Sequence, residues 1–133
     1  MSKSESNPKP TLQNNITLQI AGADHTVFMS YGLKKEILRH VGGLDNVANI
    51  FLDMDLQEAV LKVVLSERDG EGKVTTTPNI DAVASDDINR VLEWVVTHVT
   101  DFFITSLETL KRVDRTYKDR VQLLGSSEDG SKG

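Results

Sequence analysis

A stretch without glycine or proline, from Asp86 to Leu124, is the feature that most limits how this chain can fold. Along it runs one stripe of apolar residues with an average step of about 3.6 residues, the α-helical period. The stripe consists of Ile88, Leu92, Val95, Val99, Phe103, Leu107, Leu110, Val113, Tyr117, Val121 and Leu124. Ser85 is a suitable N-cap, and Asp86 and Asp87 complement the helix dipole in the first turn. The pattern therefore predicts one helix, about 58 Å long at 1.5 Å per residue.

The two halves of this helix are expected to have different surroundings. In the first half a second apolar arc flanks the stripe; this proximal arc consists of Val91, Trp94, His98 and Phe102. In the second half the arc is polar, and only a narrow seam remains among charged residues. This distal seam consists of Leu110, Val113, Tyr117 and Val121. Both are candidate protein-binding surfaces, for a partner helix or a second copy. The proximal arc can instead be core, since large aromatic side chains are usually buried.

The N-terminal residues predict a β-hairpin and a first helix. Alternating apolar residues run from Ile16 to Met29 and are interrupted by Gly22, Ala23 and Asp24, which is typical of two short strands. Ser30 is a plausible N-cap, apolar residues follow at helical spacing to Val41, and a glycine pair ends the helix. The hairpin must pack on helices or on another strand, because a single hairpin is marginal in water.

Two further short helices and a turn are expected before the long helix. The second helix runs from about Asp45 to Leu52 and should bury Val47, Ile50 and Phe51. The third begins at Asp55, which with Glu58 resembles a capping box, and ends near Ser66. Its apolar residues are Leu56, Ala59, Val60, Val63 and Val64. A turn signal at 69–72 precedes a possible edge strand from Lys73 to Thr77.

These elements together predict an α+β fold that is mainly α. An N-terminal β-hairpin is followed by three short helices, a turn or short edge strand, and one long C-terminal helix. A chain of 133 residues is long enough for one core. We expect a single helical domain at 15–124, between a disordered arm at 1–14 and a disordered tail at 125–133, because both ends carry almost no apolar residues.

Composition and motifs argue against several classes of function. The chain has 15 Lys and Arg against 20 Asp and Glu, and a net charge of -5 does not favour nucleic acid or an anionic membrane as partner. There is no cysteine, and His25, His40 and His98 do not have metal-ligand spacing. We expect no catalytic, cofactor-binding or metal-binding residues, hence no enzyme. Because the first ten residues are polar we expect no secretory signal, and no apolar run is long enough to span a bilayer.

The three short helices leave a helix-turn-helix DNA-binding regulator as an alternative. A recognition helix from Asp55 to Ser66 would carry only Lys62 as a cation, and Asp55 and Glu58 would stand at its base-facing end. The charges therefore argue against DNA binding.

Four segments together resemble the small tail assembly chaperones of long-tailed bacteriophages. They are Phe28–Leu33, Val41–Asn46, Val60–Asp69 and Glu93–Phe103. The resemblance covers roughly residues 16 to 112 and rests on helices and their spacing, without a catalytic signature.

The resemblance implies a non-enzymatic assembly factor in the host cell cytoplasm. Such a protein binds the long, helical tape-measure protein, keeps it soluble and helps tail-tube subunits gather around it. A small structural or head-tail component of a phage particle is the alternative within the same group. The residues themselves support protein binding or self-association, but do not name the partner.

Overall fold

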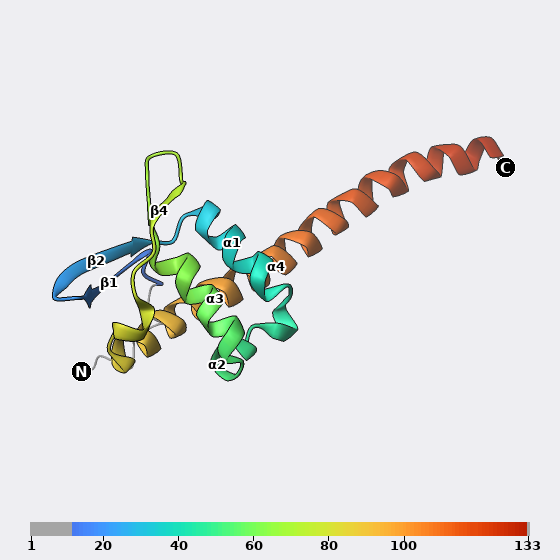
Figure 1. Cartoon of the computed structure of the whole chain (residues 1–133). Helices are drawn as coiled ribbons and strands as arrows, with labels where there is room; N and C mark the ends of the chain where they lie inside the picture. The colour runs from blue at the N-terminus through green and yellow to red at the C-terminus, as the bar shows by residue number, and fades with distance from the viewer. Residues whose placement is uncertain (1–11, 133) are drawn as a thin grey trace, which may run out of the picture. The chain divides into compact units, whose positions relative to one another are not determined.

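The computed structural model describes residues 12–132, with side chains described up to Leu123. The described chain divides into two compact units, one up to Thr100 and one from Asp101 on. The predicted single domain at 15–124 therefore spans the boundary between them. Most of the predicted arm, residues 1–11, lies outside the described residues, as does Gly133. The element order is β1, β2, α1, η1, α2, α3, β3, β4, η2 and α4 (Figure 1), which confirms the predicted fold class.

The N-terminal hairpin pairs β1 (Asn15–Ile20) with β2 (Ala23–Phe28) in antiparallel register. Its two turn residues both have positive φ, 54° at Ala21 and 82° at Gly22. Such a turn matches the right-handed twist of the strands. It begins one residue earlier than the predicted interruption. Leu18 and Val27 are buried, so one face of the hairpin belongs to the core.

Helix α1 (Tyr31–Val41) begins and ends as the sequence predicts. The Ser30 hydroxyl accepts a hydrogen bond of 3.1 Å from the Leu33 N–H and caps the helix. At the other end Gly42 adopts φ 90°, and its N–H donates to the Leu38 carbonyl at 2.8 Å. Glycine suits this position because a Cβ would be strained at positive φ.

The predicted second helix is split into a 3₁₀ helix, η1 (Leu44–Asn46), and a short α2 (Asn49–Leu52). The Ile50 N–H bonds to the Val47 carbonyl and the Phe51 N–H to the Ala48 carbonyl, both at 3.1 Å. In such i→i+3 geometry residues three apart share a face. Val47 and Ile50 are therefore buried together, whereas Phe51 is turned outward and is 43% exposed. The prediction that Phe51 is buried was wrong for this reason.

Helix α3 (Met54–Leu65) starts earlier than predicted. Asp53 is the N-cap, and its Oδ1 accepts from the N–H groups of Asp55 at 3.0 Å and Leu56 at 3.2 Å. The expected cap at Asp55 was wrong, because Asp55 already lies in the first turn. The buried residues are Val60, Leu61, Val64 and Leu65. Of the other predicted apolar positions, Leu56, Ala59 and Val63 are half-buried.

A second hairpin joins β3 (Glu67–Arg68) to β4 (Val74–Thr76), which confirms the expected edge strand and adds a partner that the sequence did not predict. The Arg68 guanidinium holds this region together. It donates to both carboxylate oxygens of Glu36 at 2.8 and 3.1 Å and to the Val63 carbonyl at 3.0 Å. A bidentate pair of this kind fixes β3 against α1. A short 3₁₀ helix, η2 (Ile80–Ala82), then precedes the long helix.

Helix α4 (Ser85–Lys132) is the predicted long helix and passes through both units (Figure 1). The Ile88 N–H donates to the Ala84 carbonyl at 3.0 Å, so Ala84 is the N-cap and the expected cap, Ser85, is one residue inside. The helix continues to Lys132, where the sequence predicted a disordered tail. Glycines 125 and 130 weaken a helix but remove no hydrogen-bond donor, and no proline is present there to stop it.

The core of the first unit combines the hairpin, α1, α2, α3 and the first part of α4. The largest fully buried side chains are Ile37, Ile50, Leu65, Leu92, Val60, Val64, Val91, Val95 and Val99. Four of these nine belong to α4, so the long helix is a main contributor to that core.

Candidate protein-binding surface

The proximal arc lies mostly in the core of the first unit. Val91 is 0% exposed, His98 3% and Trp94 8%. Phe102 is half-buried and belongs to the second unit, where its ring makes an edge contact with Phe103 at a centroid distance of 6.1 Å. Val91, Trp94 and His98 are therefore core residues, in agreement with the alternative interpretation of the proximal arc. They offer almost no surface to a partner.

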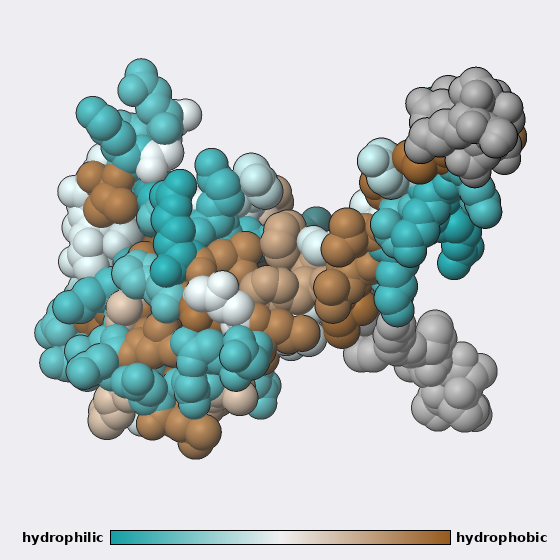
Figure 2. Space-filling view, turned by 90° about the vertical axis from the view of Figure 1, so that its right-hand side faces the viewer, coloured by the Kyte–Doolittle hydropathy of each residue, from teal (hydrophilic) through white to brown (hydrophobic). Residues whose placement is uncertain are grey.

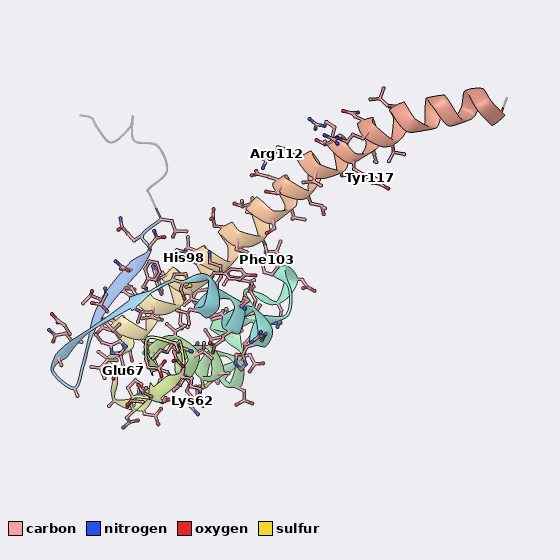
Figure 3. The ribbon with its side chains drawn as sticks, turned by 90° about the horizontal axis from the view of Figure 1, so that it is seen from above. Lys62, Glu67, His98, Phe103, Arg112 and Tyr117 are labelled. Carbon is pink, nitrogen blue, oxygen red and sulfur yellow. The ribbon has the colours of Figure 1, made fainter. Side chains whose placement is uncertain are left out.

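Trp94 and His98 are held by a single backbone oxygen. The Gln13 carbonyl accepts from Trp94 Nε1 at 2.8 Å and from His98 Nε2 at 2.7 Å. Because a carbonyl can only accept, His98 Nε2 must carry the proton. The two rings also meet edge to face, with centroids 5.0 Å apart. Figure 3 labels His98 on α4. The Gln13 carbonyl thus provides a hydrogen-bond acceptor for two buried ring nitrogens, those of Trp94 and His98.

This carbonyl lies in the segment that was predicted to be a disordered arm. Gln13 and Asn14 are instead held in place, since the Asn14 carbonyl also accepts from the Met29 N–H at 2.8 Å. A sequence pattern can reveal amphipathic side chains but carries no signal for a backbone acceptor. The contact could therefore only be found in the structure.

The distal seam has the opposite environment. Its side chains are exposed by 61% at Leu110, 57% at Val113, 64% at Tyr117 and 43% at Val121. Leu107 and Ile104, on the same helix, are about equally exposed. Arg112 and Tyr117 stand out from the helix in Figure 3. Large apolar side chains gathered in one exposed stripe make this part of α4 a candidate surface for protein contact.

The spacing in this part of α4 is that of a coiled-coil helix. Phe103, Leu110 and Tyr117 are seven residues apart, and so are Leu107, Asp114 and Val121. The two series alternate as the d and a positions of a heptad, which face a partner helix. Asp114 is the polar exception in the a series. A single polar residue at such a position fixes the register of a coiled coil at some cost in stability.

Basic residues flank the seam. Lys111 and Lys118 occupy e positions, and Arg120 occupies a g position of the same heptads. Lys118 Nζ lies 3.3 Å from Asp114 Oδ2, but both side chains are largely exposed, so this ion pair adds at most a few tenths of a kcal/mol. Beside the seam, Thr105, Ser106 and Thr109 help to line a shallow depression of about 380 Å³.

A second exposed apolar surface lies where α2 meets α3 and was missed by the sequence reasoning. Phe51 is 43% exposed, Leu52 78% and Met54 71%. We call residues 51–58 the acidic corner, because Asp53, Asp55 and Glu58 accompany these side chains. A signal for it exists in the sequence: from Val41 to Leu61 the chain has four carboxylates and no Lys or Arg.

A depression of about 680 Å³ lies between β2 and the β3–β4 hairpin. Its polar lining includes Asp24, His25, Glu67 and Asp69. Arg68 also lines it, but its guanidinium is already bonded to Glu36 and Val63. Among the described residues no three His, Asp or Glu side chains gather as a metal site would require.

Comparisons with protein-family models, curated proteins and solved structures find no match to this chain. Within the described residues, no helix has both the length and the apolar composition needed to cross a membrane. Among the surfaces described above, the geometry favours the distal seam as the candidate functional surface, because it combines heptad spacing with high exposure.

Proposed function

We propose that this chain is a non-enzymatic phage tail assembly chaperone that acts in the host cell cytoplasm. In this role it binds the tape-measure protein and helps to recruit tail-tube subunits. The observation that carries the proposal is the exposed distal seam. A helix that offers apolar a and d positions to solvent is suited to hold another long amphipathic helix.

The resemblance adds the identity of the partner, which the seam alone does not provide. Its four segments fall at element junctions and on α4. Phe28–Leu33 joins β2 to α1, Val41–Asn46 joins α1 to η1, and Val60–Asp69 joins α3 to β3. Glu93–Phe103 lies on α4 and includes Trp94 and His98, which anchor the helix in the core. In the proposed chaperone the first unit is thus a support, and the distal helix provides the binding face.

Solubilisation of a tape-measure helix follows from simple physical chemistry. An isolated amphipathic helix exposes an apolar stripe that favours aggregation. Docking of this stripe against Leu110, Val113 and Tyr117 removes apolar area of both partners from water, at roughly 25 cal/mol per Å². Lys111 and Lys118 then remain at the rim and keep the complex hydrated. The complex is accordingly expected to be more soluble than the client alone.

The proposal is tested by co-expression with a phage tape-measure protein as the client. We expect a soluble complex that co-purifies with the chain and is lost with the double variant Val113→Ser and Tyr117→Ser. Thr116→Ser with Gln122→Ser, on another face of the same helix, is the matched control and should bind normally. A client that stays insoluble with the wild-type chain, or that binds the seam variant equally well, would refute it.

The alternative of a structural head-tail component makes a different prediction about the finished particle. A chaperone is released before the particle is complete, whereas a structural component stays. Mass spectrometry of purified particles separates the two, and we expect this chain to be absent.

A further inference from the structure

The two exposed apolar surfaces carry opposite charge. The acidic corner combines Phe51, Leu52 and Met54 with carboxylates and lies in a stretch without any basic residue. From Leu110 to Arg120 the chain has five basic residues and only two acidic ones, around the distal seam. Both surfaces offer apolar contact area, and the charges around them have opposite signs. The two surfaces are therefore complementary.

The distribution of net charge along the chain also favours a contact between these two surfaces. Residues from Asp101 on contain equal numbers of basic and acidic residues, so the net charge of -5 resides in the chain up to Thr100. Figure 2 shows brown, hydrophobic atoms bordered by teal, hydrophilic ones on the first unit. The net-basic stretch from Leu110 to Arg120 is therefore attracted to the acidic first unit of another molecule before any apolar contact forms.

We propose that the distal seam of one copy docks on the acidic corner of a second copy of this chain. In this contact Leu110, Val113 and Tyr117 cover Leu52 and Met54. Lys111 and Lys118 then meet Asp55 and Glu58. Asp53 takes a smaller part, since its Oδ1 is already bonded to the start of α3.

Contacts between two identical surfaces are disfavoured. Two seams would bring Lys111 and Lys118 of both copies together, and two corners would bring Asp55 and Glu58 together. Like charges in direct contact cost binding energy, so the unlike pairing is preferred.

A lipid surface is also a poor occupant of the seam, because Asp114 stands in the middle of the stripe that would enter the membrane.

The proposed contact is heterologous, since different patches of the two copies meet. If each of two copies docks its seam on the corner of the other, the two contacts close a dimer. If only one such contact forms, one seam and one corner stay free and can bind further copies. Because the rims are charged and exposed, the association weakens with added salt. It also competes with any helix that binds the seam, whichever protein supplies that helix.

A charge-swap experiment on the purified full chain tests this inference. The seam-reversed variant carries Lys111→Glu and Lys118→Glu, and the corner-reversed variant carries Asp55→Lys and Glu58→Lys. We expect each alone to associate about tenfold more weakly than the wild type, measured by sedimentation. Mixed in equal amounts they should recover association, because the reversed surfaces again have opposite charge. Glu71→Lys with Glu93→Lys, two exposed sites away from both surfaces, is the control and should associate like the wild type.

Thermal melts verify that each variant is folded. If a charge variant does not fold, Leu52→Ser and Leu110→Ser carry the test instead, since both side chains are more than half exposed. Each should weaken association while the melting temperature stays unchanged. A wild type that remains monomeric at about 100 µM, or reversed variants that do not recover association when mixed, would overturn the proposal.

Discussion

The two halves of α4 share one helix and one hydrophobic period but have opposite environments. In the first half Val91, Val95 and Val99 are fully buried, whereas in the second half Leu110, Val113 and Tyr117 are more than half exposed. Periodicity in a sequence therefore identifies a helix and its apolar face, but does not tell what covers that face. The width of the apolar face is the more informative signal. The half with an additional arc is core, and the half with a narrow seam is open.

The largest expected effect is that of Trp94→Ala in the first half. The indole is 8% exposed and its Nε1 is bonded to the Gln13 carbonyl, so the substitution leaves a large cavity. We expect a loss of about 3 to 5 kcal/mol in the free energy of unfolding, measured with denaturant. A loss below about 1 kcal/mol would mean that Trp94 is not a core residue and would remove the contrast between the halves.

A smaller effect is expected for His98→Leu, which keeps the volume of the ring but removes the hydrogen bond from Nε2 to the Gln13 carbonyl. The Gln13 carbonyl retains Trp94 Nε1 as a donor, so this buried oxygen is not left without a partner. We expect a loss of about 1 kcal/mol in the free energy of unfolding. Val95→Ala, a truncation of a fully buried residue without a polar partner, is a suitable comparison. An unchanged stability would show that the hydrogen bond between His98 and the Gln13 carbonyl does not contribute to the stability of the first unit.

The smallest effect on stability is expected for Val113→Ser with Tyr117→Ser in the second half. Both side chains are exposed, and serine has nearly the same helix propensity as valine and tyrosine. The free energy of unfolding should change by less than about 0.5 kcal/mol. Association with a partner should nevertheless be lost. A large loss of stability together with normal association would assign these residues to a folding core rather than to a binding surface.

The sequence predicted the elements of this fold better than their surroundings. The caps of α1, Ser30 and Gly42, depend only on residues close to them in the sequence, and both predictions were confirmed. Phe51 was misplaced because the change from α to 3₁₀ geometry rotates it away from the core, which no periodic pattern reveals. Strand β3 was missed because two residues carry no alternation.

The candidate surfaces were predicted in part. The residues of the distal seam could be found from their period and from the charges around them. The role of Trp94 and His98 could not, because it depends on the Gln13 carbonyl, which lies about 80 residues earlier in the chain. The acidic corner was overlooked although the absence of basic residues from Val41 to Leu61 can be read directly from the sequence.

Hydrogen exchange along α4 tests the central contrast most directly. In dilute solution, amides from Leu92 to Val99 should exchange only through global unfolding, because their helix turns are buried in the first unit. Amides from Leu110 to Val121 should exchange much faster, since an exposed helix frays without tertiary contacts. Protection of this second group should rise when protein concentration increases, as the seam becomes covered. Equal protection of both groups at every concentration would contradict the account.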